Sequence, residues 1–157
     1  MNAHPHVSAD GNVAIIHNGI IENFAELREE LGLAGVTLQS ETDSEVAAHL
    51  VSATLPATGG DLAEAMRRVA RRLNGAFTLV ALDARRPDVI VGARRNSPLV
   101  VGVGDGEAFL ASDVAAFIAH TRNAIELGQD QVVEVTPRRR DGHRLRRSPR
   151  RGDPVHG

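Results

Sequence analysis

The chain has 157 residues, of which 42% are apolar, enough to form one hydrophobic core, and it contains no cysteine. Without cysteine the chain can hold no disulfide, no thiolate metal site and no cysteine nucleophile. Its formal net charge is −2, yet all 18 basic residues are arginines, and eight of them follow Pro137. The sequence therefore divides into an acidic body, residues 1–137, and a basic tail, residues 138–157.

The apolar segments of the chain are too short for a membrane span, and the N-terminal residues form no apolar signal region. We expect a soluble, cytoplasmic protein without a membrane partner. The acidic body is a poor surface for nucleic acid, so any such binding depends on the tail. Arginine runs attract polyanions without specificity, and we therefore expect no specific nucleic-acid partner.

The first predicted elements are a strand and a helix. Residues 12–16 are a short β-branched run that leads to Asn18-Gly19, which predicts a buried strand entering a tight turn. Between residues 22 and 31 the apolar residues recur at helical spacing, with charged residues between them. Gly32 and Gly35 then end the predicted helix.

Two further helices are predicted from capping patterns. Thr42 and Glu45 form a capping box, with Thr42 as N-cap, ahead of a helix to about residue 54. Asp61 and Glu64 repeat this pattern ahead of a second apolar stripe.

The second half of the body is predicted to be mostly strands, interrupted by a short helix from Asp113 that is capped by Ser112. Helices come first and sequential strands later, without regular βαβ alternation, which favours an α+β layered fold over a doubly wound sheet. The predicted strands are residues 76–82, 89–92, 99–103, 108–111 and 131–135.

The basic tail has a single apolar residue, Leu145, between positions 138 and 151, so we expect it to be disordered. Residues 141–147 are compatible with GC-rich codons that, read one base later, encode Thr-Val-Thr-Asp-Phe-Asp, an ordinary strand-and-turn sequence. Our hypothesis is that the chain after about Pro137 is an out-of-frame reading. Coding DNA in which no single frame change restores a longer open frame would refute it.

Three polar clusters are candidates for chemistry. His4 and His6 could ligate a metal, but no third ligand lies at a recognisable spacing, so we predict no metal site. In the second cluster, the Asn18 amide and an adjacent N–H at Gly19 could together form an oxyanion hole, although Asn-Gly is more often a simple turn. In the third, Asp43 could bind a ligand ammonium group or only complement the dipole of its helix.

Six segments together resemble the class II glutamine amidotransferase domain of glucosamine-6-phosphate synthase, from Asn2 to about Val135. Asparagine synthetases and amidophosphoribosyltransferases resemble the chain only around Asn18-Gly19 and, in the latter, at Asp43. The six segments are Asn2–His6, His17–Asn23, Ser40–Glu45, Gly92–Leu99, Phe109–Phe117 and Glu126–Gln131.

The resemblance implies an α+β fold of the N-terminal-nucleophile hydrolase type, an αββα sandwich that this chain holds in incomplete form. In that family an N-terminal cysteine attacks the side-chain amide of glutamine without a cofactor, and ammonia passes to isomerase domains on the same chain. Residues 1–137 would be a partial amidotransferase domain. By position, Asn18 and Gly19 match the oxyanion hole, Asp43 the residue that holds the substrate amino group, and His4 a histidine of the glutamine pocket. His6 and His49 are expected to be structural.

The sequence departs from the family because it starts at Met1, directly before the first motif. The family's nucleophile and the arginine that binds the glutamine carboxylate lie upstream of that motif. We therefore expect the chain alone to release no glutamate and to bind glutamine weakly or not at all. The alternative is a non-catalytic module that binds glutamine or docks on an intact subunit. A third hypothesis makes the tail a polyanion-binding arm, with salt-dependent DNA retention that is lost when residues 138–157 are deleted.

Overall fold

The computed structural model of the chain describes residues 4–137 and 143–147. Three α-helices, α1 (Phe24–Leu33), α2 (Asp43–Thr54) and α3 (Leu62–Arg72), lie in the first half together with the 3₁₀ helix η1 (Leu55–Thr58), and a second 3₁₀ helix, η2 (Val114–Ala116), follows later. The strands are β1 (His6–Val7), β2 (Val13–Ile21), β3 (Gly75–Asp83), β4 (Ile90–Arg95), β5 (Val100–Val103), β6 (Ala108–Ala111), β7 (Ala124–Glu126), β8 (Val132–Pro137) and β9 (His143–Arg147).

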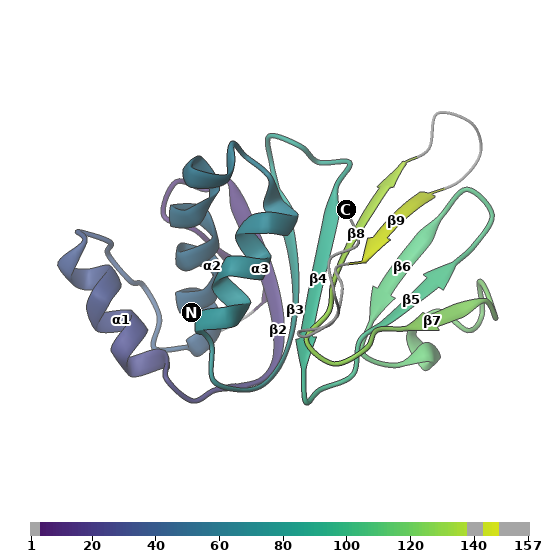
Figure 1. Cartoon of the computed structure of the whole chain (residues 1–157), viewed down its shortest axis with the longest axis horizontal. Coiled ribbons are helices and arrows are strands. Elements are labelled where there is room, and N and C mark those ends of the chain that lie inside the picture. The colour runs from purple at the N-terminus through teal and green to yellow at the C-terminus, as the bar shows by residue number, and fades with distance from the viewer. Residues whose placement is uncertain (1–3, 138–142, 148–157) are drawn as a thin grey trace, which may run out of the picture.

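The elements form three layers (Figure 1). A six-stranded antiparallel sheet in the order β1-β2-β3-β4-β8-β9 is covered on one face by α2 and α3, and α1 lies on the outer side of α2. A three-stranded sheet in the order β6-β5-β7 packs against its other face, next to β4 and β8. The α+β sandwich predicted from the sequence is confirmed, and its described layers are helices, large sheet and small sheet.

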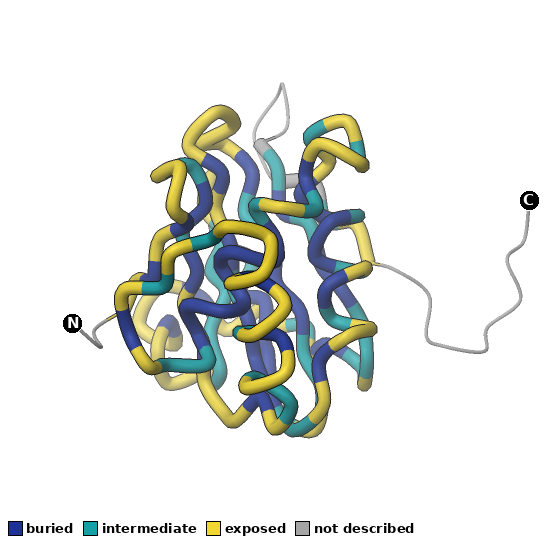
Figure 2. Tube along the Cα trace, turned by 90° about the vertical axis from the view of Figure 1, so that its left-hand side faces the viewer, coloured by how far each residue is buried: buried dark blue, intermediate teal, exposed yellow. Residues whose placement is uncertain are grey.

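Two apolar cores hold the layers together, and Figure 2 shows the buried residues running through the centre of the molecule. The larger core joins α2 and α3 to the helix-facing side of β2 and β3, where Val46, Met66 and Leu79 are fully buried. The smaller core lies between the two sheets and includes Leu99 and Val133. Period-2 alternation in β2 directs Val13 and Ile15 toward the helices.

The small sheet covers only part of the large sheet's second face, and the rest of that face, the bare sheet face, is exposed to solvent. On the face of β2 and β3 that points away from the helices, Ile16 is 46% exposed, and Leu82, on the strand paired with it, is also exposed. Ile20, further along β2, is 67% exposed. An exposed apolar sheet face of this kind is typical of a surface that another segment covers.

One local prediction is wrong because strand pairing overrides the local signal, and a second is confirmed only in part. Asn18-Gly19 is not a turn: β2 continues through it to Ile21 in unbroken register with β3. Thr42 is the N-cap of α2, which ends at Thr54 as predicted, but its side chain makes no capping bond, and Glu45 accepts hydrogen bonds from Ser40 instead.

The cap of α3 agrees with the sequence prediction, and the cap of η2 does not. The prediction that Asp61 caps α3 is confirmed, because its carboxylate accepts the backbone N–H of Glu64. The cap of η2 is Asp113 rather than the predicted Ser112.

Five residues of the tail belong to the fold. Residues 143–147 form β9, paired antiparallel with β8, so the expectation of disorder is wrong for these five residues. Leu145 lies opposite Val135 and packs against the smaller core, which gives this strand its apolar anchor. Residues 138–142 and 148–157 lie outside the described residues, and the out-of-frame hypothesis stays a prediction.

Candidate active site

One end of β2 has an open edge that faces α2. On the side of β2 away from β3, β1 pairs only with Ala14 and Ile15, so among the described residues no strand lies along that side from Ile16 to Ile21. Asp43, the first residue of α2, reaches this edge and accepts the Ile21 N–H through Oδ2 at 2.9 Å. The helix thereby closes part of the edge with a carboxylate whose side chain is 21% exposed.

We infer from the alternation of β2 that the Gly19 N–H lies on the same open edge. In β2 the odd-numbered residues direct their polar backbone groups outward, since Val13 C=O accepts a bond from Ser8 and Ile21 N–H donates to Asp43. Because the register is unbroken, Gly19 follows the same pattern and presents its N–H between His17 and Ile21.

Gly19 also has a conformation that requires glycine. Its φ is +109°, a region that L side chains rarely adopt. A Cβ here would overlap the carbonyl oxygen of Ala76 and lie 3.0 Å from the Cα of Phe77. The close pairing with β3 therefore fixes the position of the Gly19 amide.

Asn18, the neighbouring residue, lines a cavity of about 370 Å³ between the two sheets. Its amide nitrogen donates to the Ser112 hydroxyl at 3.4 Å. The lining also includes His4 and His17, while apolar groups such as Leu99 complete the wall. A mostly apolar cavity with a few polar groups at one end is typical of a small-molecule site.

Ser44 links two of the cavity's histidines. Its hydroxyl lies 2.9 Å from Nδ1 of His17 and 3.4 Å from Nε2 of His4. Nδ1 of His17 is also 3.6 Å from Oδ1 of Asp43. Nε2 of His17 is buried and has no hydrogen-bond partner among the residues that the structure describes.

The predicted site residues thus gather at one end of β2. His4 and Asn18 line the cavity, Gly19 lies on the adjacent edge, and Asp43 closes that edge. His49 lies elsewhere: its Nδ1 accepts the Ala9 N–H and its Nε2 lies 3.1 Å from Glu45.

Sequence reasoning missed three residues of this site, Ser44, His17 and Ser112. His17 could have been recognised from the alternation of β2. It lies two residues after Ile15 on the same buried face of the strand, where a polar side chain is unusual. Ser44 and Ser112 had no comparable signal, since their contacts span 40 and 94 positions of sequence.

Buried histidines make the fold sensitive to acid. Burial lowers the pKa of His17 below its ordinary 6.5; His4 and His6 lower it further, while Asp43 opposes the shift. Burial also lowers the pKa of His6, with His4 adding to the shift and Glu45 and Asp43 opposing it. Both rings favour the neutral form in the folded state, so the unfolded chain binds more protons below pH 6.5.

We therefore predict that stability is full above pH 6.5 and falls as the pH is lowered from there toward the folded-state pKa values. Urea unfolding midpoints at a series of pH values will measure the slope. His17→Gln should flatten it, whereas His120→Gln, at an exposed position, should leave it unchanged. Equal slopes in the parent and His17→Gln would contradict the assignment.

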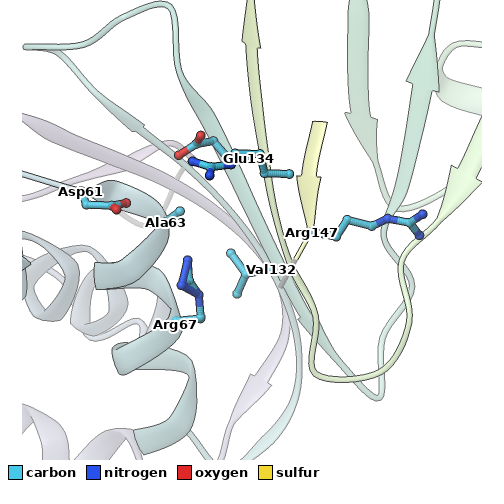
Figure 3. Close-up of a pocket in the computed structure, with 7 residues that line it drawn as sticks. Asp61, Ala63, Arg67, Val132, Glu134 and Arg147 are labelled. Carbon is cyan, nitrogen blue, oxygen red and sulfur yellow. The ribbon is translucent and has the colours of Figure 1, made fainter. Parts of the chain in front are cut away.

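A second cavity, of about 260 Å³, lies between α3 and the β8–β9 hairpin (Figure 3). Arg67 and Asp61 line it on the helix side, and Glu134 on β8. Arg67 already pairs with Glu64 at 2.7 Å, and Arg147 extends away from α3. Its charges are mixed, and we assign no chemistry to it.

The described residues contain neither a cluster of metal ligands nor a membrane-spanning helix. Within 4–137 and 143–147, no three His, Cys, Asp or Glu side chains are grouped so that they could hold a metal ion. The helices of the same residues are all too short or too polar to cross a membrane.

The layered fold is also found in a solved amidotransferase structure. Glutamine phosphoribosylpyrophosphate amidotransferase from B. subtilis, solved with ADP and GMP, superimposes with a TM-score of 0.71 over 93% of this chain and 32% of that one. The sequence identity is 21%, so the likeness is one of fold.

The sequence matches the family of the glutamine amidotransferase domain over residues 1–119, and the chain belongs to this family. It is 69% identical over 144 residues to a glutamine–fructose-6-phosphate aminotransferase (isomerizing) of Streptomyces coelicolor, covering 92% of this chain and 23% of that enzyme. It is 60% identical over 136 residues to the enzyme of the same name from Leifsonia xyli, covering 87% and 22%. The chain thus spans about a quarter of the length of these relatives.

Proposed function

We propose that the chain is the glutaminase, ammonia-donating part of a glutamine:fructose-6-phosphate aminotransferase that makes glucosamine 6-phosphate. The observation that carries this proposal is the placement of Gly19 and Asn18. Asn18 brings its side-chain amide to a cavity of about 370 Å³, and strand alternation in β2 puts the N–H of the next residue, Gly19, on the adjacent edge. Fixed donors of this kind stabilise the negative charge that develops on an amide oxygen under nucleophilic attack.

The other site residues have roles in holding glutamine. Asp43 would bind the substrate ammonium group, because its carboxylate is held at the open edge by Ile21 and accepts only one hydrogen bond from the described residues. His4 would contact the substrate from the cavity wall. Asn18 would exchange its contact with Ser112 for the substrate oxygen. The 157 residues include no cysteine, so this chain supplies binding and charge stabilisation while the nucleophile lies outside it.

A chimera tests this function. Residues 1–137 replace the matching segment of the S. coelicolor enzyme, and glutamate release and glucosamine 6-phosphate formation are measured. We expect an active chimera. Asp43→Asn keeps an acceptor for Ile21 but removes the charge, and it should raise the KM for glutamine about 10- to 100-fold.

Asp105→Asn, in an exposed loop, is the matched control and should leave the KM unchanged. A folded chimera that releases no glutamate, or one in which Asp43→Asn has the control's KM, would overturn the proposal.

A second candidate function is a non-catalytic module that binds glutamine or docks on an intact subunit. The exposed Ile16 and Ile20 on the bare sheet face favour it, together with the absence of cysteine. This alternative predicts that the chimera releases no glutamate. In either case the proposed partners are glutamine and the isomerase domains of the full-length enzyme, and the proposed location is the cytoplasm.

A further inference from the structure

The hydroxyl group of Ser44 contacts two histidine rings at once. It is the second residue of α2 and is 5% exposed, and its hydroxyl lies between two imidazoles from separate segments, His17 on β2 and His4 ahead of β1. A serine hydroxyl has one hydrogen to donate and can also accept. The direction of the hydrogen bonds therefore depends on which ring nitrogens carry protons.

The surroundings of His17 fix that direction. Two oxygen atoms lie near its Nδ1, the Ser44 hydroxyl at 2.9 Å and the Asp43 carboxylate at 3.6 Å. A carboxylate only accepts, so it favours an N–H rather than a lone pair at Nδ1. No described residue offers a hydrogen-bond partner to Nε2. The proton of the neutral ring is therefore best placed on Nδ1, which donates to Ser44.

This assignment determines the state of His4. With its oxygen accepting from His17, Ser44 directs its own hydrogen to Nε2 of His4 at 3.4 Å. Nε2 of His4 then acts as an acceptor, and the proton of the neutral ring lies on Nδ1. His4 would thus carry a hydrogen-bond donor at Nδ1, suited to a carbonyl or carboxylate oxygen.

We propose that Ser44 is a positioning residue that holds His4 in the Nδ1–H tautomer through a directed chain from His17 to Ser44 to His4. The proposal that His4 donates a hydrogen bond to a ligand rests on the proposed glutamine function. The tautomers of His17 and His4 do not depend on that function. They are properties of the ligand-free chain, so a failure of this chain of hydrogen bonds and a failure of glutamine binding are distinguishable.

Long-range ¹H–¹⁵N NMR correlations on the full chain at about pH 8 report each tautomer directly. We expect Nδ1–H for both His17 and His4. His49 is the internal control, because the Ala9 N–H donates to its Nδ1 and Nε2 faces Glu45, which requires the Nε2–H form.

Ser44→Ala should shift His4 toward the Nε2–H form that predominates for a free imidazole, while His49 stays unchanged. Ser44→Thr keeps the hydroxyl and should retain Nδ1–H at His4. Nε2–H at His4 in the parent chain, or the same His4 tautomer in Ser44→Ala, would overturn the proposal. The parent spectrum alone decides the first point even if Ser44→Ala fails to fold.

Discussion

Replacing Gly19 by alanine should destabilise the fold by about 3 kcal/mol or more. Two costs add at this position, because φ is +109° and the new Cβ would overlap the Ala76 carbonyl oxygen on β3. Backbone on a paired strand cannot move away as the end of a flexible side chain can, so β2 and β3 would have to separate locally.

Gly11 is the matched control for this prediction. Its φ is +76°, but an added Cβ would meet nothing within 4 Å. Gly11→Ala therefore has only the conformational cost, about 1 kcal/mol. Urea unfolding of both variants gives the comparison, and equal losses would show that the clash with β3 is relieved without cost. In the chimera, Gly19→Ala should also reduce glutamate release, since the amide would leave the open edge of β2.

Gly19 also shows where sequence reasoning reaches its limit. Asn-Gly between apolar residues is a strong local turn signal, and that signal is wrong here because nine consecutive pairs with β3 carry β2 straight through it. The register is a property of two segments more than 50 positions apart. Family resemblance placed Asn18, Gly19, His4 and Asp43 at one site, and the structure brings them to one end of β2, but their roles remain proposals.

Other elements were predictable for local reasons. The α3 cap at Asp61 needs only its own first turn, and the sequence pattern found it. By contrast, β9 was missed because a run of arginines looks disordered, whereas one apolar residue, Leu145, lies opposite Val135 and packs against the inter-sheet core. The bridge from Ser44 to His4 was likewise beyond sequence reasoning, because local spacing does not specify a side-chain contact across 40 positions.

The second large effect is expected at Glu45, whose buried carboxylate anchors the start of α2. It accepts the Gln39 N–H, both the N–H and the hydroxyl of Ser40, and lies 3.1 Å from Nε2 of His49. Glu45→Ala leaves these buried donors without their acceptor and should cost about 3–5 kcal/mol. Glu41→Ala, at an exposed carboxylate nearby, should stay within about 0.5 kcal/mol of the parent.

The pH dependence of Glu45 provides an independent measurement. Burial alone would raise its pKa, but the hydrogen bonds from Gln39, Ser40 and His49 outweigh it and lower the pKa from 4.5 to about 2. The folded state therefore binds this proton less readily than the unfolded chain. The stabilisation is complete above pH 4.5 and is lost as the pH falls toward 2.

Glu45→Gln should remove that loss between pH 4.5 and 2 while leaving the histidine-dependent fall, which begins near pH 6.5, in place. A parent and a Glu45→Gln variant with parallel curves below pH 4.5 would contradict the assignment. Loss of the Glu45 hydrogen bonds should also affect the candidate active site, because Asp43 and Ser44 directly precede Glu45 in α2. Freeing the start of that helix should therefore also weaken the bond from Ile21 to Asp43 and the link from Ser44 to His4.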